Sequence, residues 1–131
     1  MKRLAVVTVL LLAAVLALSA VASASGTLSG SYRTKIGSKP LGGQLKGTWT
    51  IKFSHGNYKV SLGSKVAVKG KYTISGSTVK LGHETGPLAC SSTGTYQYKI
   101  SGKGLKFTRV SDGSAACAGR AAVLAGHFMK V

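Results

Sequence analysis

Acidic residues are almost absent from this chain. Glu84 and Asp112 are the only two among its 131 residues. Catalysis by paired carboxylates would need both of them at one site, and the histidines, His55, His83 and His127, are scattered along the sequence. His83 and Glu84 are neighbours, and neighbouring side chains of an extended chain point to opposite sides. The sequence therefore predicts no catalytic residues and a protein that is not an enzyme.

Cysteine is also scarce, since Cys90 and Cys117 are the only two. They lack CxxC spacing and a nearby pair of histidines, which excludes the usual zinc site with four ligands. The glycines mark turns and strand starts and do not open a helix, so a phosphate-binding loop is excluded as well. We expect no metal, no cofactor and one disulfide, which would stabilise the fold by roughly 3 to 4 kcal/mol through a loop of about 28 residues.

The start of the chain has a composition of its own. Lys2 and Arg3 are followed by an almost wholly apolar run over residues 4–18, and small residues occupy positions 22–24. This order is typical of a secretory signal peptide. The apolar run is short for a membrane-spanning helix, which needs about 20 residues. We expect a signal peptide over residues 1–24, secretion of the cleaved protein, and no membrane-spanning segment after cleavage.

Without residues 1–24 the chain keeps 16 basic residues against the same two acids, a formal charge of +14. A charge of this size attracts anionic surfaces or polymers. It also keeps an exported protein soluble without any further role. The sequence leaves both interpretations open. It contains no motif for sequence-specific nucleic-acid binding.

Most of the mature chain alternates between apolar and polar residues with a period of two, and turns containing glycine interrupt the alternation at short intervals. No helical segment is evident. The pattern predicts an all-β fold, an antiparallel up-and-down barrel of about eight strands, formed by residues 25–131 as one monomeric domain. The predicted strands are 28–36, 44–53, 57–62, 65–74, 77–82, 94–101, 104–110 and 121–130.

The aromatic residues share the phase that is predicted to face the interior. Several follow a glycine by two positions, as in Gly47-Thr48-Trp49 and Gly94-Thr95-Tyr96, where a side chain would crowd its neighbour on a bent strand. A barrel of this size is either filled by side chains or holds one small ligand. The candidate ligand-binding residues of the interior are Tyr32, Trp49, Phe53, Tyr58, Tyr72, Tyr96, Tyr98, Phe107 and Arg109.

Arg109 is the unusual member of this set. It continues the phase of Phe107 and is therefore predicted to point inward unless a bulge intervenes. A buried guanidinium needs a partner, which could be the carboxylate of a ligand or the ring of Trp49 at one end of the barrel. Arg120 is open to the same alternatives, and because it follows the second cysteine closely, pairing with Asp112 in the loop is a further one.

The basic residues of the strands fall on the opposite phase, which is predicted to face outward. An outer-membrane barrel would place apolar residues there. The pattern therefore favours a barrel with a cationic coat in water. The residues of this coat are Arg33, Lys35, Lys52, Lys59, Lys65, Lys69, Lys71, Lys80, Lys99 and Lys106.

Gly47-Thr48-Trp49 at a strand start, followed by serial hairpins and a late arginine, resembles the calycin superfamily of lipocalin-like barrels. Three segments, 90–96, 104–107 and 112–120, are similar to small exported bacterial lipocalin-like proteins of unassigned activity. The resemblance implies a small hydrophobic ligand in the barrel and a tryptophan packed by an arginine at the closed end. The chain departs from typical lipocalins by its short length, an additional strand before Trp49 and no C-terminal helix.

These sequence features predict three alternative functions. The first is a secreted binding protein that holds a small hydrophobic or amphipathic ligand in the barrel. The second is a protein-interaction module, such as an inhibitor of a secreted protease. The third is a cationic envelope-associated protein that binds anionic surfaces. A filled interior would favour the second over the first.

Overall fold

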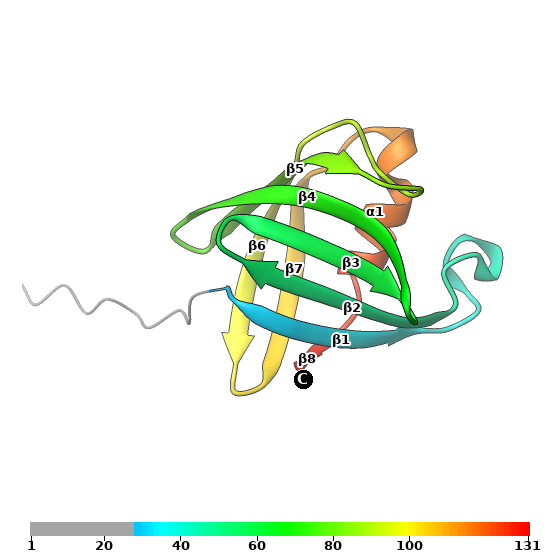
Figure 1. Ribbon diagram of the computed structural model, residues 1–131, viewed down its shortest axis with the longest axis horizontal. Helices are drawn as coiled ribbons and strands as arrows, with labels where there is room; N and C mark the ends of the chain where they lie inside the picture. The colour runs from blue at the N-terminus through cyan, green and yellow to red at the C-terminus, as the bar shows by residue number, and fades with distance from the viewer. Residues whose placement is uncertain (1–27) are drawn as a thin grey trace, which may run out of the picture.

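The computed structural model describes residues 28–131, which form one closed β-barrel (Figure 1). Its strands are all antiparallel and follow one another around the barrel in chain order, and the last strand pairs with the first. The prediction of an eight-stranded antiparallel up-and-down barrel is confirmed. The strands are β1 (Gly30–Ile36), β2 (Gly47–Ser54), β3 (Asn57–Leu62), β4 (Lys65–Ser75), β5 (Thr78–Thr85), β6 (Gly94–Ser101), β7 (Gly104–Ser111) and β8 (Phe128–Lys130). The signal peptide predicted for residues 1–24 lies outside the described residues.

Strand β2 shows how the alternating pattern produces the two faces of the barrel wall. Trp49, Ile51 and Phe53 are buried, whereas Lys52 between them is exposed. Side chains of successive strand residues point to opposite faces, so an alternating sequence buries one set and solvates the other. All ten basic residues that were predicted to face outward are exposed. The cationic coat is therefore confirmed for the described strands.

The C-terminal segment is where the predicted elements are wrong. Residues 121–130 were predicted as a strand, but Ala118–Leu124 forms helix α1 and only Phe128–Lys130 is a strand. Alanine and leucine, which dominate residues 121–125, are the strongest helix formers. A helix this short is marginal alone, and it is held by burial of Val123 and Leu124 against the barrel.

Short helices gather at one end of the barrel. The 3-10 helix η1 (Pro40–Gly43) follows β1, and the 3-10 helix η2 (Ala115–Cys117) leads directly into α1. Figure 1 shows α1 and the loop between β5 and β6 at the end opposite the β2–β3 turn. None of the helices in residues 28–131 has the length and apolar character to cross a membrane.

Aromatic rings fill the part of the barrel interior around Phe53, near the β2–β3 turn. Phe53 lies at their centre, with its ring centroid 5.1 Å from that of Tyr72 and 6.4 Å from those of Tyr32 and Phe107. Phe107 in turn meets Phe128 of β8 at 5.8 Å. These edge-to-face and tilted contacts are the favoured geometry for aromatic pairs. The interior thus divides into a packed aromatic part and a part that is not filled.

Candidate functional site

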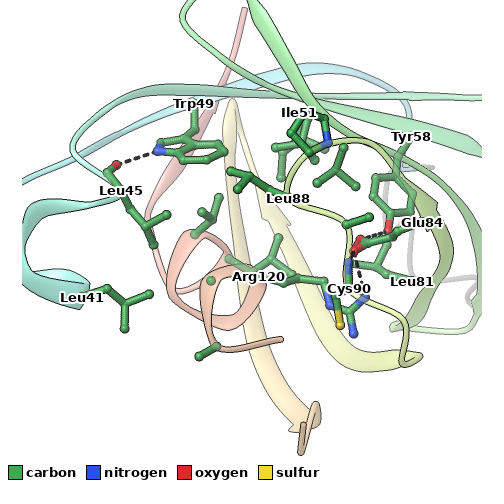
Figure 2. Close-up of a pocket in the computed structure, with 18 of the residues that line it drawn as sticks. Leu41, Leu45, Trp49, Ile51, Tyr58, Leu81, Glu84, Leu88, Cys90 and Arg120 are labelled. Carbon is green, nitrogen blue, oxygen red and sulfur yellow. Dashed lines mark hydrogen bonds and ion pairs between the residues drawn. The ribbon is translucent and has the colours of Figure 1, made fainter. Parts of the chain in front are cut away.

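The unfilled part of the barrel is a cavity of about 410 Å³. Strand residues form its floor, and η1, the loop after β5 and α1 surround its mouth (Figure 2). A volume of this size is within the range of sites for small molecules. The residues that line it are Leu41, Gln44, Leu45, Trp49, Ile51, Phe53, Tyr58, Val60, Val68, Leu81, Glu84, Pro87, Leu88, Ala89, Cys90, Ala115, Ala118, Gly119, Arg120, Val123 and Leu124.

The wall of the cavity is mostly apolar, and its one indole is fixed in place. The Trp49 indole N–H donates a hydrogen bond of 2.7 Å to the carbonyl oxygen of Leu45. The ring therefore needs no ligand to satisfy its donor, and it contributes only apolar surface to the cavity. Leu41 and Leu88 at the mouth remain 45% and 55% exposed. Large apolar side chains left open to water around a cavity are typical of a binding site for an apolar molecule.

Three of the nine candidate ligand-binding residues line the cavity, namely Trp49, Phe53 and Tyr58. Tyr32, Tyr72, Tyr96, Tyr98 and Phe107 belong to the core outside the cavity wall. The hydroxyls of Tyr72 and Tyr98 donate to the backbone carbonyls of Leu28 and Gly76, each at 3.2 Å. Those two hydroxyls are satisfied by the barrel itself.

The prediction that Arg109 points into the interior is wrong, because Arg109 is exposed. The register between β6 and β7 shifts at this point: Arg109 lies opposite Tyr96, whereas Ser111 lies opposite Thr95. Val110 is the additional residue, and the burial alternation of β7 ends at Phe107. A bulge of this kind redirects the side chains of the strand.

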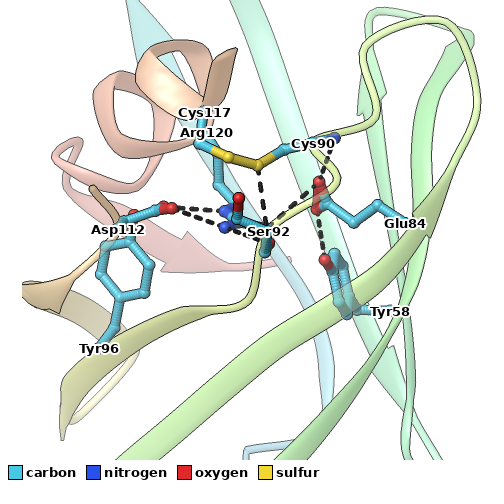
Figure 3. Close-up of polar contacts among 8 residues, drawn as sticks. All are labelled: Tyr58, Glu84, Cys90, Ser92, Tyr96, Asp112, Cys117 and Arg120. Carbon is cyan, nitrogen blue, oxygen red and sulfur yellow. Dashed lines mark hydrogen bonds and ion pairs between the residues drawn. A yellow bond between two sulfur atoms is a disulfide. The ribbon is translucent and has the colours of Figure 1, made fainter. Parts of the chain in front are cut away.

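Arg120 is instead the arginine of the interior, and it holds both acids of the chain (Figure 3). Its Nε and Nη2 donate to Asp112 at 2.8 and 2.6 Å, and Nη2 also donates to the carbonyl of Ser92 at 2.8 Å. The predicted pairing of Arg120 with Asp112 is confirmed. Nη1 lies 3.4 Å from Glu84 Oε1. The side chains of Arg120, Glu84 and Asp112 are 7%, 2% and 0% exposed, so the network is shielded from water.

Two tyrosine hydroxyls complete the network. Tyr58 donates a hydrogen bond of 2.5 Å to Glu84 Oε2, and Tyr96 donates to Asp112 Oδ2. Burial, with the adjacent carboxylates, raises the pKa of both tyrosines. Burial would raise the pKa of Asp112 as well, but hydrogen bonds from Arg120 and Tyr96 outweigh it and hold that pKa below its ordinary value. Asp112 is therefore ionised and both tyrosines are neutral donors near neutral pH.

Gly94 allows the network to pack this closely on β6. A Cβ atom at this position would lie 2.8 Å from Arg120 Nη2 and 2.9 Å from Asp112 Oδ2. A side chain there would have to displace a buried ion pair. The glycine of Gly94-Thr95-Tyr96 thus leaves room for a neighbour, as the pattern of glycine two residues before an aromatic predicted.

The disulfide between Cys90 and Cys117 is confirmed. It joins the loop after β5 to the end of η2, immediately before α1, directly over the network (Figure 3). The Cys90 backbone N–H donates to Glu84 Oε1 at 2.9 Å. Cys90, Cys117 and Asp112 have the proximity of a metal site, but the two sulfurs are bonded to each other and Asp112 is bound to Arg120. The residues of this cluster therefore serve the fold.

The histidines do not contribute to the cavity. His55, His83 and His127 are exposed and belong to separate segments of the barrel. His83 faces solvent while Glu84 is buried, as expected for neighbours on a strand. Most of the other lining residues were not among the candidates. Glu84, Leu88 and Leu124 are examples, because they come from a strand end, a loop and a helix that the sequence pattern did not indicate.

The acid sensitivity of the network can be predicted from Asp112. Its pKa is lowered in the folded protein from an ordinary value of 3.8, so its contribution to stability is present above pH 3.8 and is lost as the pH falls through the folded pKa. We expect Asp112→Asn to have a lower free energy of unfolding than the native protein at pH 6. The difference between the two free energies should become smaller below pH 3.8. Urea denaturation between pH 6 and pH 2 measures this. A difference that stays constant over that range would contradict it.

Comparison with protein families, with curated proteins and with solved structures finds no match for this chain. The resemblance to lipocalin-like barrels gains support only at the level of the closed antiparallel barrel. The cavity and the surface of the barrel are the features of this protein that bear on its function.

Proposed function

We propose that this protein is a carrier that holds one small, largely apolar molecule inside its barrel. The observation that supports the proposal most directly is the cavity of about 410 Å³ with its apolar wall and its exposed leucines at the mouth. Packed interiors have few voids larger than a water molecule. Burial of a ligand here would contribute roughly 0.8 kcal/mol for each methylene group removed from water.

The charges of the wall favour a ligand with an uncharged polar head. Among residues 28–131, Glu84 and Arg120 are the only charged residues that line the cavity, and Arg120 Nη1 lies 3.4 Å from Glu84 Oε1. The carboxylates of Glu84 and Asp112 already occupy Arg120, so a third carboxylate placed beside them would be repelled by both. An alcohol or ester avoids this repulsion, and we therefore expect it to bind more tightly than the corresponding carboxylate.

We further propose that the carrier is exported and belongs with the lipocalin-like barrels that it resembles. The disulfide supports export, because such bonds persist mainly in oxidising compartments. Trp49 and Arg120 both line the cavity, in keeping with the tryptophan and arginine that the resemblance implies at one end of the barrel. Arg120, however, is bound to Asp112, so its charge is already balanced within the fold.

Trp49 provides the measurement, because it is the only tryptophan of the chain and lines the cavity. We expect its fluorescence to saturate on titration with 1-decanol, and the affinity to rise about fourfold for each methylene added along a series of short alcohols. Decanoate should bind more weakly than decanol. No saturable change with any alcohol would overturn the carrier function.

Two surface leucine and valine positions give a matched pair of variants for this test. Leu88 at the mouth is 55% exposed, and Val110 outside the cavity is 57% exposed. Leu88→Gln is expected to weaken decanol binding several-fold, whereas Val110→Gln leaves it unchanged. Because both side chains are already half in water, neither variant should unfold the protein. Equal effects of the two variants would place the ligand outside the cavity.

A further inference from the structure

The charges of this protein are separated between its interior and its surface. Both acids of the chain, Glu84 and Asp112, are buried against Arg120. Every other lysine and arginine of residues 28–131 is exposed. The surface of the described barrel therefore carries basic side chains without any acidic side chain among them.

Three of these lysines face one another across neighbouring strands. Lys52 of β2 lies opposite Lys59 of β3, and Lys59 lies opposite Lys69 of β4. Residues directly opposite in an antiparallel pair have Cβ atoms only about 5 Å apart. Lys52, Lys59 and Lys69, which we call the lysine row, thus place three ammonium groups side by side on the outer wall.

The lysine row is electrostatically unfavourable for the isolated protein. Like charges directly opposite each other destabilise a sheet, and the surface of residues 28–131 has no acidic side chain to relieve them. Solubility requires net charge but does not require lysines to face each other on three successive strands. Such an arrangement is favourable when an anion lies across it.

The row also borders a hollow of about 270 Å³. The three lysines share its lining with Ser54, Asn57, Tyr58 and Gly70. The Ser54 hydroxyl is hydrogen-bonded to the His55 ring at 3.0 Å, whereas the Asn57 amide donates one N–H to the His55 carbonyl at 3.3 Å and keeps a second N–H for a phosphate oxygen. The hollow therefore combines three positive charges with neutral polar groups.

We propose that the lysine row binds consecutive phosphates of a flexible linear polyanion. The row crosses three strands of a curved barrel wall, so a flexible chain can follow it, whereas a flat membrane meets such a surface over a small area. The aromatic rings of residues 28–131 are buried or half-buried in the core, which leaves no exposed platform for stacked bases. The contacts available are those to phosphate charges.

The test is binding of fluorescently labelled inorganic polyphosphate, followed by anisotropy at several salt concentrations. The triple variant Lys52→Gln, Lys59→Gln and Lys69→Gln is expected to lose at least about tenfold in affinity, and the slope of log affinity against log salt should fall by about 2 because three phosphate contacts are lost. The variant should remain folded, with a Tm equal to or above that of the native protein, because repulsion is removed.

A second triple variant controls for net charge. Lys35, Lys65 and Lys80 are exposed and lie opposite Thr48, Leu62 and Thr73, respectively, so none of them faces another lysine. Their replacement by glutamine removes the same charge and is expected to lower the affinity only about twofold. Equal losses in the two triple variants would overturn the proposal in favour of a general charge effect.

Two competitors complete the design. Vesicles of phosphatidylglycerol and phosphatidylcholine represent a membrane surface, and hyaluronan represents a carboxylate polymer. Both are expected to displace polyphosphate only weakly. If binding of the vesicles depends on the lysine row and binding of polyphosphate does not, the partner is a membrane surface. If hyaluronan at matched charge competes as well as unlabelled polyphosphate, the row does not select phosphate, and a phosphate chain is not its specific partner.

Discussion

Replacement of Arg120 by methionine is expected to destabilise the protein by about 3 to 5 kcal/mol. Methionine matches the length of the aliphatic stem but leaves Asp112 and Glu84 buried without their positive partner. Removal of one member of a buried ion pair has a cost of this size, because the remaining charge stays out of water. The loss is a large fraction of the stability of a domain this small. Urea denaturation at pH 7 measures it directly.

Arg33 supplies the control for this variant. It is exposed and lies opposite Thr50 and Met129, away from the network, and Arg33→Met removes the same charge from the chain. We expect a change within about 0.5 kcal/mol, as for most surface substitutions. If the two variants lose similar stability, the network around Arg120 does not support the fold.

A second variant tests the mechanism of the Arg120 effect. Asp112→Asn removes the charge that Arg120→Met leaves uncompensated. The double variant Arg120→Met and Asp112→Asn is therefore expected to be more stable than Arg120→Met alone. The two substitutions act on one ion pair, so their losses of stability are not additive. Additive losses would show that the two side chains stabilise the protein independently.

Loss of the disulfide is expected to have the second-largest effect. Cys90 and Cys117 are 27 positions apart, and closing such a loop stabilises a fold by about 3 to 4 kcal/mol on the chain-entropy estimate. The bond also fixes the Cys90 N–H that donates to Glu84. In the double variant Cys90→Ser and Cys117→Ser we expect Tm to fall by more than about 10 °C.

Calorimetry of the native protein with and without reductant provides the matching comparison. The reduced native protein and the double serine variant should melt at similar temperatures, because both lack the bond. If both have a Tm within about 2 °C of that of the oxidised native protein, the disulfide contributes little to the stability of the barrel.

The barrel could be predicted from the sequence because most of its strands bury one face and carry a period of two. Trp49, Ile51 and Phe53 alternate with half-buried or exposed residues, and this local pattern needs no knowledge of the rest of the fold. Helix α1 could not be predicted in this way. Its seven residues carry no period, and its conformation depends on alanine propensity and on docking against the barrel end.

The candidate site was predictable only in part. Trp49, Phe53 and Tyr58 follow from the inward phase of the strands. The cavity beside them could not be predicted, because it depends on the three-dimensional packing of side chains from distant parts of the chain. Arg109 was misplaced because the bulge at Val110 leaves no mark in the residue types of β7. Glu84 was missed as a partner of Arg120 because the two are far apart in sequence and meet only when the chain folds.

The short β8 determines how the barrel assembles. Neighbouring strands from β1 to β7 are joined by nearby segments of chain, so these pairs can form as local hairpins with little loss of loop entropy. The pairing of β1 with β8 brings together distant parts of the described chain through Tyr32 opposite Lys130 and Arg33 opposite Met129. We therefore expect closure to be a late step of folding. Until it occurs, β1 and β7 are open edges, and the lysines and arginine beside them discourage another chain from pairing there.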